Sequence, residues 1–442
     1  MPKAHRAAPP IEVDANAHHP LGMPPVRFLR DYWQKHPLLI RNAFPDFAPP
    51  LSPDDLAGLA CMDGALARIV LQTTSSLRRT RRGAGNPLLE VDQKPDSGSR
   101  PRRIRNDDKS NWQATLPNVR WEVHTGPFEE TTFARLPERN WTLLVQDVDK
   151  WDAGTAALLD RFAFIPSWRI DDVMISYAID GGGVGAHVDQ YDVFLLQGSG
   201  QRRWSIDTHA NPSTEFRDDV ELKLLREFRP THQWTLDPGD MLYLPPNVPH
   251  DGEAVGDCMT FSIGMRAPST AELLLDLAVH VAESLPESRR FADPGLQPAD
   301  RFGEIDDDAL QRARLALGVA AIMPDDDAFA DWFGGFITRY RTAQVPVPRK
   351  RTIDRIKLAE RLPNATLEVD PWSRFAWRRR GRDARLYVAG NVFDAPLAWA
   401  RELASGARTL RGSRLAKLPK STRGIALLAK LIDAGFITFR QH

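Results

Sequence analysis

The 442-residue sequence has few cysteines, no membrane-length apolar run and no apolar signal-peptide core near its start. Its two cysteines, Cys61 and Cys258, are too few for a disulfide framework and indicate a reducing compartment. It has no apolar run near the roughly 18 residues of a membrane helix, and its first residues lack the apolar core of a signal peptide. Because 58 Lys and Arg balance 58 Asp and Glu, the net charge implies no polyanionic partner. We therefore expect a cytoplasmic protein without a membrane partner.

Composition changes along the chain and predicts four parts. Residues 1–22, rich in Pro, Ala and His, are expected to be a disordered lead. Residues 23–266 are expected to form a β-rich domain that a flexible basic insertion at 73–118 interrupts. Residues 267–344 read as a helical region, and residues 345–442 as a linker followed by a small α+β module that resembles a winged helix.

The β-rich part predicts a closed or layered sheet. Its apolar segments between Trp141 and Arg266 are short, rich in β-branched residues, and separated by Gly, Pro, Asp or Asn. This spacing favours a sandwich or barrel over alternating β–α units. Beyond it, apolar residues recur at helical spacing, which predicts a bundle with room for a dimerising face.

Two basic stretches allow either of two interpretations. Arginines between 78 and 105 in the insertion can contact RNA phosphates, although a solvated loop is the favoured interpretation. Arg378 to Arg380 in the last module can bind nucleic acid, or they can be the charged edge of a strand.

The stretch Gly181 to Ile206 contains the first chemically suggestive pattern. Its four glycines indicate a tight bend or a close backbone approach, followed by His187 and Asp189 on one face of an expected strand. Downstream, the proline-stiffened segment after Met241 to Leu244 ends in His250. Two imidazoles and one carboxylate form the facial triad of non-haem Fe(II) sites, whereas a structural zinc site prefers four ligands with cysteine. The pattern therefore predicts a metal site, with a satisfied polar network as the alternative.

Neighbouring residues can complete such a site. Gly198 to Gly200 can turn the strand back, and the returning segment carries Arg202 and Arg203, one facing inward and suited to a carboxylate. Alternation places Ser176 and Asp180 on one face upstream. Asp180 can receive a cationic side chain or simply form a turn before glycine.

These motifs resemble the bacterial ribosomal oxygenases of the JmjC, or cupin-like, family. The resemblance rests on GGGVGAHVDQYDVFLLQGSGQRRW, PGDMLYLPPNVPHDG and FLRDYWQKHPLLIRNAF. It implies a JmjC double-stranded β-helix, a helical dimerisation region and a C-terminal winged helix. It also implies Fe(II) and O₂ as cofactors and 2-oxoglutarate as cosubstrate, and the insertion at 73–118 departs from its compact members.

The resemblance further implies a role for each candidate residue. His187, Asp189 and His250 would bind iron, Arg202 with help from Ser176 would hold 2-oxoglutarate, and Asp180 would receive a substrate arginine. The implied reaction is hydroxylation of an arginine β-carbon in large-subunit ribosomal protein sixteen by a homodimeric enzyme. Three alternatives remain: another JmjC outcome such as histidine hydroxylation or N-methyl demethylation, a small-molecule cupin enzyme, and a non-catalytic ribosome- or RNA-binding protein.

Overall fold

The computed structural model describes residues 9–74, 119–288, 326–341, 344–419 and 421–440, with isolated positions between 289 and 325. Two compact units account for the chain: Met1–Gln146 with Met174–Ser262, and Asp147–Val173 with Ile263–His442. Among the described residues, no helix is long and apolar enough to cross a membrane.

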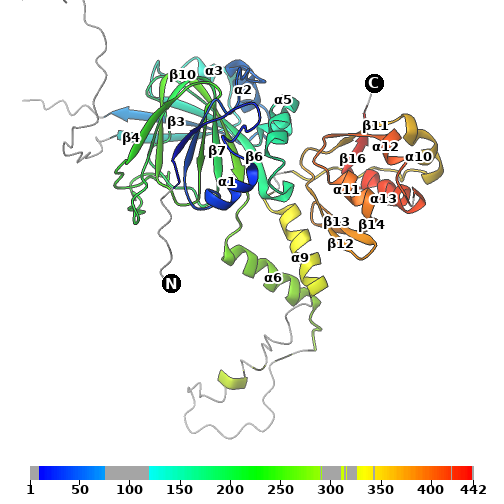
Figure 1. Cartoon of the computed structure of the whole chain (residues 1–442). Helices are drawn as coiled ribbons and strands as arrows, with labels where there is room; N and C mark the ends of the chain where they lie inside the picture. The colour runs from blue at the N-terminus through cyan, green and yellow to red at the C-terminus, as the bar shows by residue number, and fades with distance from the viewer. Residues whose placement is uncertain are drawn as a thin grey trace, which may run out of the picture. The chain divides into compact units, whose positions relative to one another are not determined.

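The first unit is built on a ten-stranded sheet in the order β1-β2-β9-β7-β10-β6-β5-β3-β4, with β8 paired to β7. Figure 1 labels β3, β4, β6, β7 and β10 of this sheet. Its strands are β1 (Glu12–Asp14), β2 (Leu38–Arg41), β3 (Ala67–Thr74), β4 (Val119–Thr125), β5 (Trp141–Val145), β6 (Ile170–Ala178), β7 (Val193–Ile206), β8 (His232–Leu236), β9 (Met241–Leu244) and β10 (His250–Met265). Its helices are α1 (Pro25–Asp31), α2 (Pro53–Ala60) and α3 (Glu130–Phe133). The β-rich fold expected for this part of the chain is confirmed.

The core of this sheet explains why β9 is apolar at every position. Its four residues are all buried, because β2 and β7 pair with its two edges and side chains cover both faces. The helix α1 and the residues directly after it contribute an aromatic cover. The ring of Phe28 lies 4.9 Å from that of Tyr243, and Trp33 stacks 5.9 Å from the same tyrosine.

Two sequence-based expectations for this unit are wrong. Residues 9–22 are not a disordered lead: β1 pairs in parallel with β2, and Leu21 is buried. Gly198 and Gly200 do not reverse the chain either, because β7 runs without interruption past both of them. A Cβ at Gly200 would lie 1.9 Å from the carbonyl oxygen of Asp257, so glycine lets β7 continue close against β10.

The second unit combines helices with the C-terminal module (Figure 1). Its helices and strands are α4 (Val148–Trp151), α5 (Ala153–Ala157), α6 (Thr270–Ser284), α9 (Asp326–Arg339), α10 (Arg355–Arg361), α11 (Leu397–Leu403), α12 (Gly412–Leu415), α13 (Ser421–Asp433), β11 (Thr366–Val369), β12 (Phe375–Arg380), β13 (Asp383–Val388), β14 (Asn391–Pro396), β15 (Thr409–Arg411) and β16 (Ile437–Phe439). Three short 3₁₀ helices, η1 (Leu158–Phe162), η2 (Ser167–Arg169) and η3 (Leu362–Asn364), complete the described elements. The module has its own core around the fully buried Trp399.

A buried charge cluster ties the segments of the second unit together. The Asp171 carboxylate accepts from Arg266 at 3.1 Å and from Arg374 at 3.0 Å. Arg266 has no exposed side-chain surface, and its Nη1 also donates to the carbonyl of Ile337 in α9. One carboxylate therefore serves two arginines, and breaking such a buried set is costly.

Two predicted segments fall on residues outside those described. The basic insertion at 73–118 is described only at Thr73 and Thr74, which end β3, while β4 begins at Val119 and pairs with β3. The middle of the predicted helical region at 267–344 also lies mostly outside the described residues, whereas its described ends form helices α6 and α9.

Candidate metal centre and cosubstrate site

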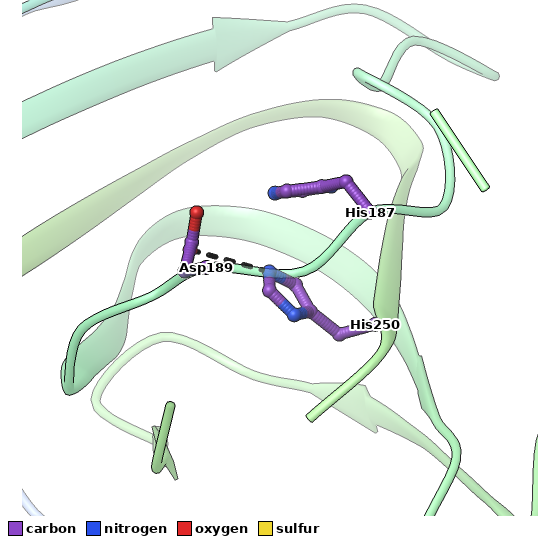
Figure 2. A group of neighbouring side chains, drawn as sticks. All are labelled: His187, Asp189 and His250. Carbon is purple, nitrogen blue, oxygen red and sulfur yellow. Dashed lines mark ion pairs between the residues drawn. The ribbon is translucent and has the colours of Figure 1, made fainter. Parts of the chain in front are cut away.

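The structure brings His187, Asp189 and His250 together (Figure 2). Their potential ligand atoms all lie within 4.8 Å of one another, and His250 Nε2 is 3.6 Å from Asp189 Oδ2. His250 is the first residue of β10. The sequence predicted His187 and Asp189 on a strand, but both lie in the segment that precedes β7.

A backbone bridge fixes the two histidines relative to each other. Each backbone N–H of His187 and His250 donates to the other residue's carbonyl at 3.0 Å, and the ring centroids are 4.2 Å apart. The Nδ1 of His187 lies 2.8 Å from the carbonyl of Gly185, and that of His250 lies 2.9 Å from the carbonyl of Val248. Because a carbonyl only accepts, Nδ1 carries the proton, and each Nε2 lone pair is free for a metal.

The electrostatics also suit a metal ligand. Burial, followed by the nearby His187, lowers the pKa of His250 to about 4, while Asp189 acts in the opposite direction. His250 is therefore neutral at physiological pH, which is the form that coordinates a metal. Cys258 is buried against Ala178 and Ala254 and does not belong to this group.

Arg202 and Arg203 point to opposite sides of β7. Arg203 is 41% exposed in its side chain and pairs with Glu253 at 3.3 Å. Arg202 is buried, and its Nη1 donates to Ser176 Oγ at 3.1 Å. Its Nε and Nη2 have no hydrogen-bond partner in the described part of the chain. A buried guanidinium with two unused donors fits a carboxylate, since such groups rarely stay unpaired.

Two further side chains at this sheet were not found by sequence reasoning. Trp204 is buried, its ring lies 5.9 Å from that of His250, and its indole N–H has no partner among the described residues. Thr142 on β5 is buried with an unpaired hydroxyl, and it shares a face with Leu144, which pairs opposite Ser176. The signal for Trp204 was available, because it lies two residues beyond Arg202 and therefore on the same side of β7.

The glycine run serves the protein's own backbone. A Cβ at Gly182 would lie 2.2 Å from the carbonyl oxygen of Trp141, and one at Gly183 would lie 2.5 Å from that of Gly252. Gly185 adopts a positive φ of 78°, just before the first histidine. These contacts show close packing of the backbone, which positions His187.

Asp180 does not join the metal group. It lies beyond the end of β6, where its side chain is 44% exposed. One carboxylate oxygen accepts from the backbone N–H of Gly256 at 3.0 Å, and the other pairs with Arg139 at 2.6 Å. The predicted receptor for a cationic side chain thus already holds an arginine of this chain.

Comparison with protein-family models finds matches between residues 157 and 438. Residues 157–273 match the JmjC domain, residues 321–438 match the ROXA-like winged helix, and residues 231–337 match the AraC-like ligand binding domain. The chain is 30% identical over 419 residues to the Escherichia coli ribosomal protein uL16 3-hydroxylase, covering 93% of this chain and 96% of that protein. It is 32% identical over 292 residues to a probable ribosomal oxygenase of Haemophilus influenzae, covering 62% and 61%.

Solved structures agree with these matches. The crystal structure of E. coli YcfD superposes with a TM-score of 0.71 at 30% identity, covering 95% of this chain and 99% of that one. YcfD in complex with cobalt and 2-oxoglutarate gives a TM-score of 0.70 at 29% identity with the same coverage. With a matching fold over nearly the whole length, and a His–Asp–His group beside a buried arginine, the chain belongs to the JmjC-type ribosomal oxygenases.

Proposed function

We propose that this protein is an Fe(II)- and 2-oxoglutarate-dependent hydroxylase that acts on the β-carbon of an arginine in ribosomal protein uL16, in the cytoplasm. The observation that carries the proposal is the pairing of two features: a three-residue metal group and a buried Arg202 with two unused donors. A protein that only bound RNA or ribosomes would need neither. The uL16 3-hydroxylase relative and the YcfD complex with 2-oxoglutarate support the choice of reaction.

Each side chain has a defined task in this proposal. His187, Asp189 and His250 would hold the metal through two Nε2 atoms and a carboxylate oxygen. Arg202, with Ser176, would hold the distal carboxylate of 2-oxoglutarate. The oxidative chemistry, in which hydroxylation is coupled to conversion of 2-oxoglutarate and O₂ to succinate and CO₂, would come from a bound Fe(II). The protein supplies orientation and exclusion of water.

Recognition of the substrate arginine requires an acidic side chain, and the chain offers two candidates. Asp180 is the expected receptor, and a substrate arginine would have to displace Arg139 from it. Asp172 lies four residues before Ser176 on β6, so alternation places both on the same side of that strand. Burial, together with Asp171 and Asp147, raises the pKa of Asp172 to about 7, and a guanidinium beside it would stabilise its ionised form.

The test is reconstitution under anaerobic conditions, followed by Fe(II), 2-oxoglutarate, O₂ and an arginine-containing uL16 peptide. Mass spectrometry follows the peptide while succinate is quantified. We expect one added oxygen on arginine for each succinate formed, and no activity in Asp189→Ala. Succinate without peptide oxidation would refute the substrate, and no succinate from iron-loaded protein would refute the reaction. The variants Asp180→Asn and Asp172→Asn identify the receptor for the substrate arginine. The variant that removes the receptor should lose peptide oxidation but still form succinate in the uncoupled reaction.

We also propose that the protein is a homodimer that associates through α6. This helix has no buried residue, and Leu274, Leu275 and Val279 are each more than half exposed. An apolar helix face of this kind is covered by a partner in most soluble proteins. Light scattering on Leu274→Glu/Leu275→Glu should give half the wild-type mass, and an unchanged dimeric mass would contradict this interface.

A further inference from the structure

Formal charge is divided sharply between parts of a chain whose total is zero. Residues 119–288 contain 13 Lys and Arg against 28 Asp and Glu, whereas residues 345–442 contain 21 Lys and Arg against 8 Asp and Glu. The acidic part, which carries the metal group, suits a cationic ribosomal protein. The strongly basic C-terminal module would repel the same protein, so its charge indicates a different, polyanionic partner.

The arginine-rich hairpin of β12 and β13 does not provide this surface. Arg378 lies directly opposite Arg385, an arrangement of like charges that destabilises a strand pair unless acids compensate. The acids come from α9 and β14. Arg378 and Arg380 pair with Asp327, and Arg385 pairs with Asp394 and Asp331. Most of the cations predicted to contact nucleic acid therefore neutralise carboxylates of this chain.

A second group of cations remains available. We define the α10 face as the basic residues on α10, the segment before it, and the adjoining parts of α13 and β16: Arg349, Lys350, Arg351, Arg355, Lys357, Arg361, Lys430 and Arg440. Five of them, Lys350, Arg351, Arg355, Lys357 and Lys430, are exposed and have no ion pair to any described residue.

Backbone contacts make the α10 face continuous. The backbone N–H of Arg349 donates to the carbonyl of Asp433 at the end of α13, and α10 packs against that helix (Figure 1). Arg361 lies over the ring of Phe439 in β16, 4.0 Å from its centroid. Arg440, which follows Phe439, donates a hydrogen bond from its backbone N–H to the carbonyl of Thr366. The cations thus belong to one packed surface and not to separate loops.

The acids of this surface are few and already engaged. Asp354 caps α10 by accepting from the backbone N–H groups of Ile356 and Lys357, and Asp433 accepts from the backbone N–H of Ile353. Glu368 pairs with Arg440 at 3.4 Å. Glu360 is exposed on α10, so the α10 face keeps a clear cationic excess.

We propose that the α10 face binds RNA through its phosphates. Exposed cations without ion-pair partners are the arrangement that contacts phosphates, and the counterions that such contacts release favour binding. The choice of RNA over other polyanions rests on the proposed function, because a ribosomal protein substrate is found beside RNA. The module would then hold the enzyme on an RNA-containing target while the acidic part accepts the protein.

The test uses full-length protein and a short fluorescein-labelled single-stranded RNA, with anisotropy measured between about 50 and 200 mM KCl. The variant combines Arg351→Gln, Arg355→Gln, Lys357→Gln and Lys430→Gln. A matched control removes four exposed cations elsewhere on the module: Arg379→Gln, Arg382→Gln, Arg401→Gln and Arg411→Gln. Phosphatidylserine vesicles serve as the alternative anionic surface.

We expect wild type and control to bind within twofold of each other and the α10-face variant to bind at least about tenfold more weakly. The slope of log K against log salt should flatten by about 3 in that variant, since each contact to single-stranded RNA contributes about 0.7. Equal losses in both variants, no RNA binding by wild type, or binding to vesicles without RNA binding would each overturn the proposal. The assay contains no iron or 2-oxoglutarate, so its failure is separate from failure of the proposed reaction. Hydroxylation of free peptide should be unchanged in the α10-face variant.

Discussion

Arg202→Gln offers the sharpest test of the cosubstrate site. The wild-type guanidinium is buried, spends one donor on Ser176 and keeps Nε and Nη2 without partners in the described structure. Two charge-assisted bonds to a carboxylate would be worth about 1.5–3 kcal/mol each. Their loss is about 3–6 kcal/mol together, and every 1.4 kcal/mol is tenfold in affinity. The dissociation constant for 2-oxoglutarate should therefore rise by about 10² to 10⁴.

Calorimetric titration of 2-oxoglutarate into Mn(II)-loaded protein measures this affinity without turnover. Arg203→Gln is the matched control, because it removes the same group from the next position, where the side chain is exposed and pairs with Glu253. Arg202→Lys should fall between wild type and glutamine, since it keeps the charge but loses the planar fork. If Arg202→Gln bound 2-oxoglutarate within about threefold of wild type, the reasoning from the two unused donors would be wrong.

Four further outcomes are expected. Asp189→Ala should abolish succinate formation while leaving the circular dichroism spectrum unchanged; a variant that still turned over would exclude this carboxylate as a ligand. Asp171→Ala should lower the free energy of unfolding by about 3–5 kcal/mol, because it removes the carboxylate that pairs with the fully buried Arg266; urea titration measures this loss, and a value below about 1 kcal/mol would contradict the reasoning. The pKa of Asp172 is raised to about 7, above its unfolded value, so the folded form is penalised as pH rises from about 4 to 7. Wild type should lose at most about 4 kcal/mol over that range, and Asp172→Asn should show a smaller loss in urea titrations at pH 5 and 8. Gly182→Ala should cost about 1–3 kcal/mol, since its Cβ meets the Trp141 carbonyl at 2.2 Å; an unchanged urea midpoint would show that the backbone relaxes freely.

Much of the site could be predicted because its residues stand close to strong local signals. His187 and Asp189 follow a glycine run, and His250 ends a proline-stiffened segment after a fully apolar strand. Such signals are local in sequence, and they survive errors about the exact secondary structure. The segment holding His187 is not a strand, yet its backbone bridge to His250 achieves what the strand was expected to do.

The features that the sequence did not reveal share a cause. The local sequence does not show which distant segment packs against a residue in the fold. Gly198 and Gly200 have the composition of a turn, but the adjacent strand β10 requires their lack of side chains. For Arg378 and Arg380 the sequence left nucleic-acid contact and a charged strand edge both open, and it did not reveal that Asp327, more than 50 residues earlier, pairs with both. Residues 9–22 contain few large apolar side chains, and their pairing with β2 and the burial of Leu21 are not apparent from the sequence. Each outcome depended on a partner distant in sequence.

The two histidines of the metal group are joined by hydrogen bonds between their main chains, so the local backbone structure does not depend on their side chains. Replacing either imidazole would leave both backbone hydrogen bonds in place. A descendant of this enzyme could therefore lose catalysis by a single substitution and drift into a pseudoenzyme with an intact fold. Within such a lineage, superposition of the folds would not distinguish active enzymes from inactive ones. The identity of the three side chains in the metal group would distinguish them.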